Sequence, residues 1–229
     1  MQIEKRGSTN INSQIRLGSS VHVLELSRLS SQGVPRPYVL DGFLSNAECS
    51  DILRELEFAL WRPSLTYQRQ NDGQYHDVLN LPFRVSETAF QEWFSSELTD
   101  MLERIEKRLQ TVVAFELSHL EGWQAISYAP RGHFEYHLDA GYWEGHHAGD
   151  RILTFLIYLT TPIKGGSTHF RALEVDVKAK AGRLIIWSNL FLNGFCDHRM
   201  IHSGSPLLRG KKTILVTWVR QKSCRTAHK

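Results

Sequence analysis

A histidine and an aspartate two residues apart, followed much later by a second histidine and a lysine, are the residues of this chain best placed for metal chemistry. They are His137, Asp139, His202 and Lys212. Side chains on a strand repeat with a period of two, so His137 and Asp139 would point to one face. His202 on a facing strand would complete three ligands, an arrangement typical of non-haem Fe(II) oxygenases. The pattern predicts an iron- and 2-oxoglutarate-dependent hydroxylase in which Lys212 binds the far carboxylate of the keto acid.

Chance is the alternative to this interpretation, because the chain has 11 histidines. One H-x-D tripeptide is unsurprising among so many, and a lysine ten residues after a histidine is no rarer. The pattern has three parts, the His137–Asp139 pair, His202 and Lys212, and each lies beside a segment with the pattern of a strand. That setting favours a metal site over coincidence.

Length and composition indicate one globular domain. The chain has 229 residues, 41% of them hydrophobic and 22% charged, which is ordinary for a soluble protein with a large core. Its net charge of +3 is mild and it has no dense run of Lys and Arg, so nucleic-acid binding is not predicted. No window approaches the roughly 20 apolar residues that cross a bilayer, so no membrane segment is predicted either.

The ends of the chain and its cysteines bear on domain limits and location. Residues 1–20 are polar and lack the apolar core of a secretory signal, and the three cysteines are scattered without paired spacing. Both observations favour a reducing cytoplasm. We expect residues 1–20 to form a flexible arm, residues 21–222 a single dioxygenase domain, and residues 223–229 a C-terminal tail.

Helices are predicted ahead of strands, which favours an α+β fold. Ser45 and Glu48 have the spacing of a capping box at the start of one helix, and one-sided apolar residues predict a second helix over residues 87–109. Strand patterns follow over residues 112–117, 123–129, 151–159, 168–177, 183–188 and 213–219. This order predicts helices packed on one face of a mainly antiparallel barrel or sandwich. Residues 62–86 are polar and aperiodic, so we expect a long loop or irregular hairpin that serves as a lid.

Over residues 35–222 the chain resembles the prolyl 4-hydroxylase family of 2-oxoglutarate oxygenases. The matching phrases are Asp41-Gly42-Phe43-Leu44-Ser45, Ile105-Glu106-Lys107-Arg108-Leu109, Arg151…Thr154…Tyr158-Leu159, Gly165-Gly166 and Asn189-Leu190-Phe191…Gly194…Asp197…His202. The resemblance implies a double-stranded β-helix, or jelly roll, flanked by N-terminal helices. It also implies Fe(II) on His137, Asp139 and His202, with ascorbate as an accessory reductant. Asp139 argues against a halogenating relative, which would carry a small residue there.

The same resemblance implies a binding site for 2-oxoglutarate. Lys212 matches the family's basic residue for the distal carboxylate, and its neighbour Lys211 should face the other side of the strand. Tyr158, Thr154 and Tyr128 match positions near the co-substrate. From the residues alone, a packed strand aromatic is the simpler explanation of Tyr158.

Positions near the substrate include both matches and departures. Arg151, Glu121 and Trp218 match family positions close to the substrate proline. Phe134 stands where many members have a tyrosine, and Arg220 replaces a frequent histidine. The substrate is therefore either a prolyl residue of a peptide or protein, or a free or carrier-tethered amino acid or small metabolite. A catalytically inactive jelly-roll binding protein is the third alternative.

Overall fold

Two antiparallel sheets form the body of the protein. The computed structural model describes residues 36–70, 75–143 and 145–225. The larger sheet has the strand order β1 (Tyr38–Leu40), β13 (Leu184–Ser188), β9 (Arg151–Tyr158), β16 (Lys212–Arg220), β7 (Gln124–Tyr128), β6 (Glu87–Phe90) and β2 (Arg62–Pro63). The smaller sheet has the order β12 (Val175–Val177), β11 (Thr168–Phe170), β14 (His202–Gly204), β8 (His133–His137) and β5 (Arg84–Val85).

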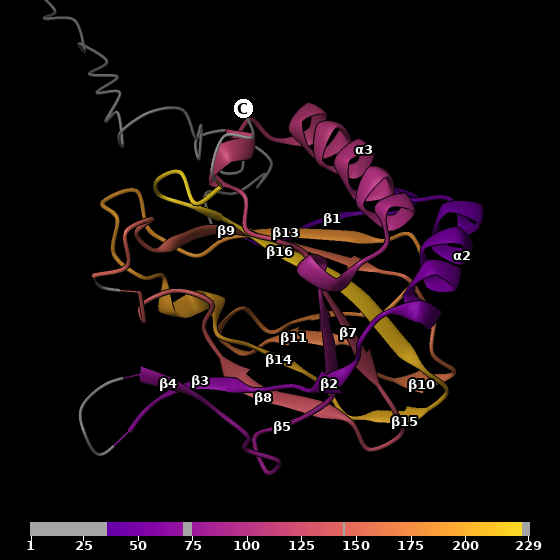
Figure 1. Cartoon of the computed structure of the whole chain (residues 1–229). Coiled ribbons are helices and arrows are strands. Elements are labelled where there is room, and N and C mark those ends of the chain that lie inside the picture. The colour runs from indigo at the N-terminus through magenta and orange to yellow at the C-terminus, as the bar shows by residue number, and fades with distance from the viewer. Residues whose placement is uncertain (1–35, 71–74, 144, 226–229) are drawn as a thin grey trace, which may run out of the picture.

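Short elements complete the fold. Two further pairs of strands are β10 (Lys164–Gly165) with β15 (Leu207–Arg209), and β3 (Thr66–Arg69) with β4 (Tyr75–Val78). The α-helices are α2 (Asn46–Glu55) and α3 (Ser96–Val112), and the 3-10 helices are η1 (Leu56–Phe58), η2 (Gln91–Trp93), η3 (Leu117–His119), η4 (Arg171–Leu173) and η5 (His198–Met200). Figure 1 shows α2 and α3 covering the outer face of the larger sheet. The predicted α+β jelly roll with flanking helices is confirmed.

The two faces of the larger sheet belong to two hydrophobic clusters. Leu153, Phe155 and Ile157 of β9 pack toward the helices, while Leu156 and Tyr158 pack between the sheets. This alternation follows from the period of two along a strand. The second cluster, which includes Phe170 and Trp187, forms the floor of the space between the sheets.

The capping box predicted for the first helix is present. The Ser45 hydroxyl accepts from the Glu48 backbone N–H at 3.2 Å, and the Glu48 carboxylate accepts from the Ser45 backbone N–H at 2.8 Å. The helix begins at Asn46 as a result, and it buries Cys49 and Ile52 against the sheet. Such a pair of bonds satisfies amides that the first turn leaves without partners.

Three predicted elements differ from the structure. The second helix begins at Ser96, not at residue 87, because residues 87–90 pair with β7 and Ser95 caps the helix through the Leu98 N–H. Residues 112–117 are not a strand, since Val112 ends α3. The strand predicted over residues 168–177 is a hairpin of β11 and β12, divided by η4 and by Glu174 in the left-handed region at φ +53°.

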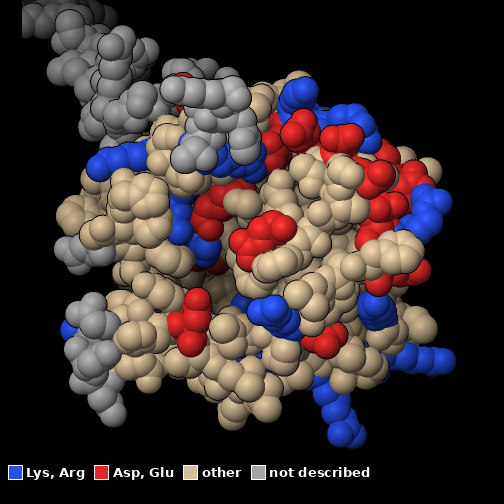
Figure 2. All heavy atoms as spheres, in the orientation of Figure 1, with Lys and Arg blue, Asp and Glu red and all other residues tan. Residues whose placement is uncertain are grey.

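Residues 62–86 form the predicted irregular hairpin. They contain β2 to β5, and β3 pairs with β4 in antiparallel register. The turn signal at residues 71–73 and the predicted arm at residues 1–20 lie outside the described residues. Among the helices that the structure describes, none is long and apolar enough to cross a membrane. On the face shown in Figure 2, acidic and basic side chains are interspersed around α2 and α3. This face shows no continuous basic surface of the kind that binds a polyanion.

Gly182 lets the loop before β13 approach the start of α2. The Leu44 N–H donates to the Gly182 carbonyl at 3.1 Å, and Gly182 has a φ of +76°. A Cβ at this position would overlap the Leu44 carbonyl oxygen, whereas a Cβ at Gly194, with a φ of +86°, would meet nothing within 4 Å. The two glycines share the backbone conformation and differ in the space around them.

Gly182→Ala is therefore expected to destabilise the fold more than Gly194→Ala. Left-handed backbone costs an alanine on the order of 1–2 kcal/mol at either site. The clash with Leu44 should add about 2 kcal/mol or more to the loss for Gly182→Ala. Urea unfolding of the two variants measures the difference, and equal losses would show that the approach of Leu44 is not tight.

Candidate active site

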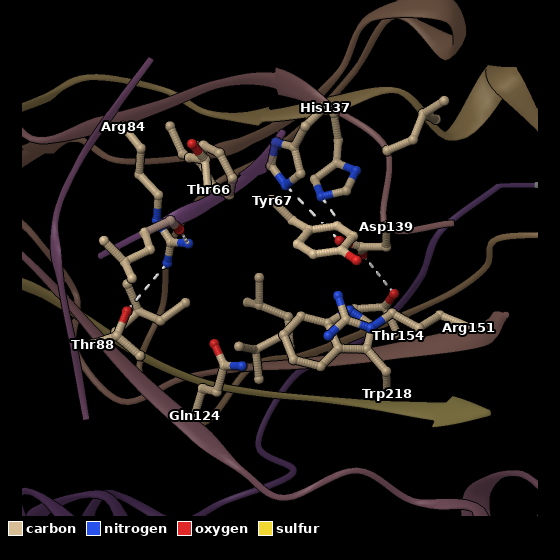
Figure 3. Close-up of a pocket in the computed structure, with 18 of the residues that line it drawn as sticks. Thr66, Tyr67, Arg84, Thr88, Gln124, His137, Asp139, Arg151, Thr154 and Trp218 are labelled. Carbon is tan, nitrogen blue, oxygen red and sulfur yellow. Dashed lines mark hydrogen bonds and ion pairs between the residues drawn. The ribbon is translucent and has the colours of Figure 1, made fainter. Parts of the chain in front are cut away.

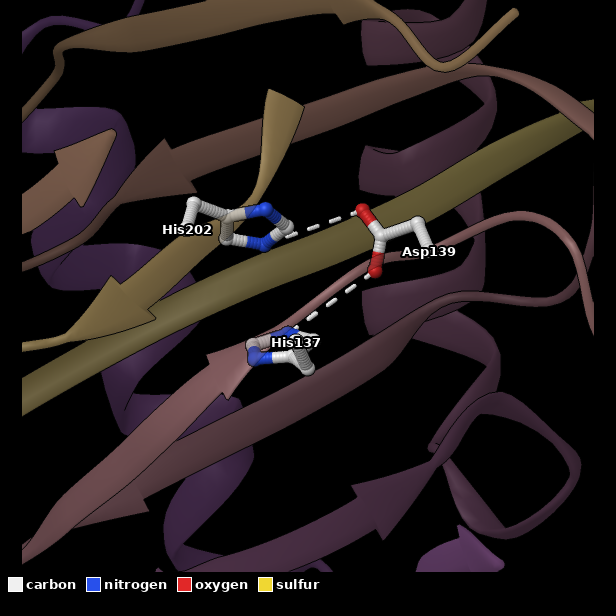
Figure 4. Close-up of side chains that lie close together, drawn as sticks. All are labelled: His137, Asp139 and His202. Carbon is white, nitrogen blue, oxygen red and sulfur yellow. Dashed lines mark ion pairs between the residues drawn. The ribbon is translucent and has the colours of Figure 1, made fainter. Parts of the chain in front are cut away.

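The three predicted ligands converge at the open end of the smaller sheet. His137 is the last residue of β8 and His202 is the first of β14, and the two are paired in the strand register. The Nε2 atoms of His137 and His202 each lie 3.9 Å from an Asp139 carboxylate oxygen, and the three ligand atoms lie within 4.8 Å of one another. Figure 4 shows the imidazoles and the carboxylate turned toward a common point. One metal ion could be held by all three side chains.

Backbone carbonyls set the imidazole tautomers. The Nδ1 of His137 lies 2.8 Å from the Glu135 carbonyl oxygen, and the Nδ1 of His202 lies 2.9 Å from the Met200 carbonyl oxygen. A carbonyl only accepts, so each Nδ1 carries the proton and each Nε2 presents a lone pair to the metal position. Burial, together with the neighbouring His202, lowers the pKa of His137 to about 3, which keeps its ring neutral. Both properties are those of metal-binding histidines.

Thr154 and Asn189 orient the carboxylate. The Thr154 hydroxyl donates to Asp139 at 2.7 Å and accepts from the Asn189 amide at 2.9 Å. Burial opposes ionisation of Asp139, but His202, His137 and Arg151 outweigh it and hold the pKa of the carboxyl below its usual value. The sequence placed Thr154 at the co-substrate, and it included Asn189 in a matching phrase without giving it a role. The Thr154 hydroxyl is already hydrogen-bonded to Asp139. A contact of Thr154 with the co-substrate stays a prediction.

A cavity of about 560 Å³ opens beside the ligands, between the two sheets and under the β3–β4 hairpin. Its lining includes Tyr128, Thr154 and Lys212. Lys212 is 2% exposed, and its ammonium lies 4.6 Å from the centre of the Tyr128 ring. No acceptor among the described residues binds this ammonium, and burial lowers the pKa of Lys212 to about 7. A buried lysine without a counter-ion is costly, so the site fits an anionic ligand.

Tyr158 lies behind the cavity wall. Its hydroxyl is hydrogen-bonded to the Thr168 hydroxyl at 2.6 Å and donates to the Val177 carbonyl at 3.2 Å. Thr168 lines the cavity, and burial raises the pKa of Tyr158. The tyrosine therefore packs in the core and holds Thr168, while a contact of Tyr158 with the co-substrate stays a prediction.

Glu121 joins two arginines, of which Arg151 lines the cavity. It accepts from Arg151 through both carboxylate oxygens, at 2.7 and 2.8 Å, and its Oε1 also pairs with the Arg220 guanidinium. The Arg151 guanidinium stacks 3.6 Å from the centre of a Trp218 ring. The three residues expected from the sequence, Arg151, Glu121 and Trp218, are thus brought together. With Arg220 added, this group carries two cations for one carboxylate.

The hairpin closes over the site through an aromatic contact that sequence reasoning missed. The rings of Tyr67 on β3 and Trp143 are stacked with centroids 4.7 Å apart. The Arg151 and Arg220 guanidiniums lie 4.7 and 4.2 Å from the Trp143 ring, and the indole N–H donates to the Asp139 carbonyl at 3.2 Å. The only signal in the sequence was an aromatic residue four positions after Asp139 in a polar loop.

Phe134 and Arg84 form the opposite wall, as Figure 3 shows for Arg84. The Phe134 ring stacks on the His137 imidazole at 3.7 Å, and the Arg84 guanidinium lies 4.4 Å from the Phe134 ring. Arg84 is 8% exposed and donates to neutral oxygens of Ser86 and Leu65 at 3.0 Å. It has no carboxylate partner among the described residues, and burial lowers its pKa. Arg84 was not identified from the sequence.

Comparison with known sequences gives a consistent result. Residues 123–220, which include His137, Asp139, His202 and Lys212, match the family model of the 2OG-Fe(II) oxygenase superfamily. Prolyl 4-hydroxylase subunit alpha-1 of Rattus norvegicus is 28% identical over 194 residues, 82% of this chain and 35% of that protein. The Gallus gallus subunit is 29% identical over 169 residues, 71% of this chain and 32% of that protein. The chain spans about a third of the length of these curated relatives.

Solved structures show the same fold. A viral collagen prolyl hydroxylase from Paramecium Bursaria Chlorella virus-1, in complex with 2OG, has a TM-score of 0.59 and 22% identity, covering 80% of this chain and 95% of that one. A prolyl-4-hydroxylase from Pseudomonas putida has a TM-score of 0.53 and 18% identity, covering 80% of this chain and 91% of that one.

Thr154→Val should weaken Fe(II) binding about 10- to 100-fold, because loss of a residue that orients a metal ligand has effects of that size. Thr213→Val is the matched control, since Thr213 is a buried threonine of β16 whose hydroxyl has no partner in the described structure. Anaerobic Fe(II) titration measures both affinities. Equal affinities in the two variants would show that the bond from Thr154 to Asp139 does not support the metal site.

Proposed function

We propose that this chain, whose residues 123–220 match the 2OG-Fe(II) oxygenase superfamily, is a 2-oxoglutarate-dependent dioxygenase that hydroxylates a prolyl residue of a peptide or protein. The observation that carries the proposal is the pairing of a complete ligand set with Lys212, a buried cation without a counter-ion in the same cavity. When bound, Fe(II) and 2-oxoglutarate supply the chemistry: O₂ is consumed, the keto acid becomes succinate and CO₂, and a C–H bond of the substrate is hydroxylated. His137, Asp139 and His202 would hold the metal.

The protein's own residues divide the cavity into two halves. Lys212 and Tyr128 line the half that would receive the distal carboxylate of 2-oxoglutarate, where a low-dielectric wall strengthens the ion pair. Arg151 and Trp218 line the half that would receive the substrate.

The β3–β4 hairpin would act as the lid predicted for residues 62–86. Its Tyr67 already stacks on Trp143, and Phe134 covers one face of the His137 ring. Both contacts exclude water from the metal position, which suits a reaction whose intermediates must be protected from side reactions. Opening and closing of this hairpin would admit a substrate and then enclose it.

A free or carrier-tethered amino acid is the second candidate substrate, and Arg84 is the observation that favours it. This buried guanidinium lies in the cavity wall without a carboxylate partner among the described residues. Free carboxylates bind arginine through charge-assisted hydrogen bonds, whereas a peptide offers only neutral carbonyls. Phe134, one of the two departures from the family pattern, lies beside Arg84 in the same wall.

We propose a cytoplasmic location and a role for ascorbate as an accessory reductant. The three cysteines, Cys49, Cys196 and Cys224, are free thiols, which supports a reducing compartment. The protein would act without nucleic acid or membrane as a partner.

Succinate formation with defined substrates tests the reaction. We expect a proline-rich peptide, such as a Pro-Pro-Gly repeat, to stimulate succinate release and to gain one oxygen atom by mass spectrometry. His202→Ala should lose both signals. Stimulation by free L-proline alone would favour the second candidate. Absence of both turnover and the visible charge-transfer band of the anaerobic Fe(II)–2-oxoglutarate complex would indicate a binding protein without catalysis.

Lys212→Met is expected to raise the dissociation constant of 2-oxoglutarate about 30-fold or more, because it removes one partner of a buried charge pair. Lys211→Met, at the exposed neighbour, should have no effect. The pKa of Lys212 in the free protein is about 7, and the ligand binds the protonated form. The wild-type dissociation constant should therefore be constant below pH 7 and rise about tenfold per pH unit above it. An unchanged dissociation constant in Lys212→Met, together with a pH-independent constant in wild type, would show that Lys212 is not the partner.

A further inference from the structure

The last described residues return to the site from outside the jelly roll. Residues 223–225 run beside η3, where the Cys224 and Arg225 N–H groups both donate to the Ser118 carbonyl, at 2.9 and 3.0 Å. The Ser223 hydroxyl donates to the same oxygen at 3.2 Å. We call residues 223–225 the C-terminal clamp. The sequence placed them in a tail outside the domain, but their hydrogen bonds attach them to it.

Arg225 makes the strongest contacts of the clamp. Its two terminal nitrogens bind the Glu106 carboxylate of α3 at 2.8 and 2.7 Å. The Glu106 side chain is only 4% exposed and also accepts from the Trp123 indole at 2.9 Å. The remaining guanidinium donors reach two consecutive carbonyls, Leu120 at 2.7 Å and Glu121 at 3.1 Å. A planar fork that holds a buried carboxylate and two carbonyls orients the two peptide planes on either side of Glu121.

Glu121 lies between these two peptide planes, and its carboxylate binds both arginines beside the proposed substrate half of the cavity. Glu121 is bound by Arg225 at its backbone and binds Arg151 and Arg220 through its carboxylate. Its backbone N–H also donates to the Trp218 carbonyl at 2.8 Å. The path from Arg225 to Arg151 therefore passes through a single residue. The path from the clamp to a metal ligand is longer, because it continues from Arg151 through the Trp143 ring to the Asp139 backbone carbonyl.

We propose that Arg225 is a positioning residue for the substrate half of the active site, acting through Glu121 on Arg151. This inference rests on the proposed hydroxylase function. Glu106 neutralises Arg225, so the single Glu121 carboxylate is left to the two site arginines. Without Arg225 the Leu120 carbonyl loses its guanidinium donor and the Glu121 carbonyl keeps only the bond from the Thr217 hydroxyl, at 2.8 Å. Small displacements of a positioning group cost on the order of a hundredfold in rate.

Arg225→Gln tests the proposal, with two readouts that a purely structural role would leave unchanged. The first is the coupling ratio, the succinate formed per hydroxylated Pro-Pro-Gly peptide, which should rise together with a KM for the peptide increased about tenfold or more. The KM for 2-oxoglutarate and the slow decarboxylation without peptide should stay within about twofold. The second readout is the NMR signal of the Arg151 Nε–H, assigned by its loss in Arg151→Lys. It should broaden or shift in Arg225→Gln.

Two further variants keep the test decisive. Arg225→Gln combined with Glu106→Gln removes the unpaired buried carboxylate, so it serves if the single variant does not fold. The amide oxygen introduced by Glu106→Gln can still accept from the Trp123 indole. Arg108→Gln is the matched control, because it breaks an ion pair of the same helix, with Glu48 at 2.9 Å, far from Glu121. Arg225→Lys should restore part of the coupling, since it keeps the charge but not the planar fork.

The outcomes separate this proposal from the proposed function. If wild type forms the Fe(II)–2-oxoglutarate complex but turns over no prolyl peptide, the substrate assignment fails, and the Arg151 signal still decides the role of Arg225. An unchanged signal and coupling ratio in a folded Arg225 variant would overturn the clamp. A uniform fall of both half-reactions with lower thermal stability would overturn it too, because it would show a general effect on folding.

Discussion

The pairing of His202 with His137 across β14 and β8 is the constraint on which the site depends. These two residues face each other in the strand register, although 65 positions separate them in the chain. A shift of one residue in either strand would turn its histidine to the opposite face, because side chains alternate along a strand. Asp139 lies two residues after the end of β8, so the same register brings the third ligand close to the two histidines. The metal site is thus a consequence of correct sheet pairing, with the rest of the fold serving to fix that pairing.

The larger sheet shows how one strand can serve stability and chemistry together. On β9, Phe155 and Ile157 face the helices, while Thr154 faces the cavity and binds Asp139. On β16, Leu215 and Val219 take the helix side, while Lys212 lines the cavity. Burial of the helix-facing residues stabilises the strands by roughly 1.5–3 kcal/mol per side chain. That stabilisation offsets the cost of keeping Lys212 buried without a partner.

The sequence predicted the parts of the site that depend on local spacing. His137 and Asp139 are two apart, and Ser45 and Glu48 three apart, so each pair is close in space through local chain geometry. The prediction that His137 and Asp139 share a strand was wrong, because β8 ends at His137 and Asp139 lies in the bend that follows. Contacts between residues on separate segments of the chain could not be predicted from spacing. The bond from Thr154 to Asp139 and the stacking of Tyr67 on Trp143 exist only once separate segments are brought together. The start of α3 was misplaced because apolar residues 90, 93 and 94 continue a helical spacing that pairing with β7 overrides.

The two departures from the family pattern, Phe134 and Arg220, both lie outside the contacts that hold the metal ligands in place. Phe134 stacks on a ligand ring without a hydrogen bond, and Arg220 shares Glu121 with Arg151. The tautomers of the histidines are set by backbone carbonyls, and the orientation of Asp139 by Thr154. None of these bonds involves Phe134 or Arg220, so a substitution at either position leaves the hydrogen-bond partners of the metal ligands unchanged. The contacts that orient the ligands and the ion pairs among Glu121, Arg151 and Arg220 are thus separate groups of contacts.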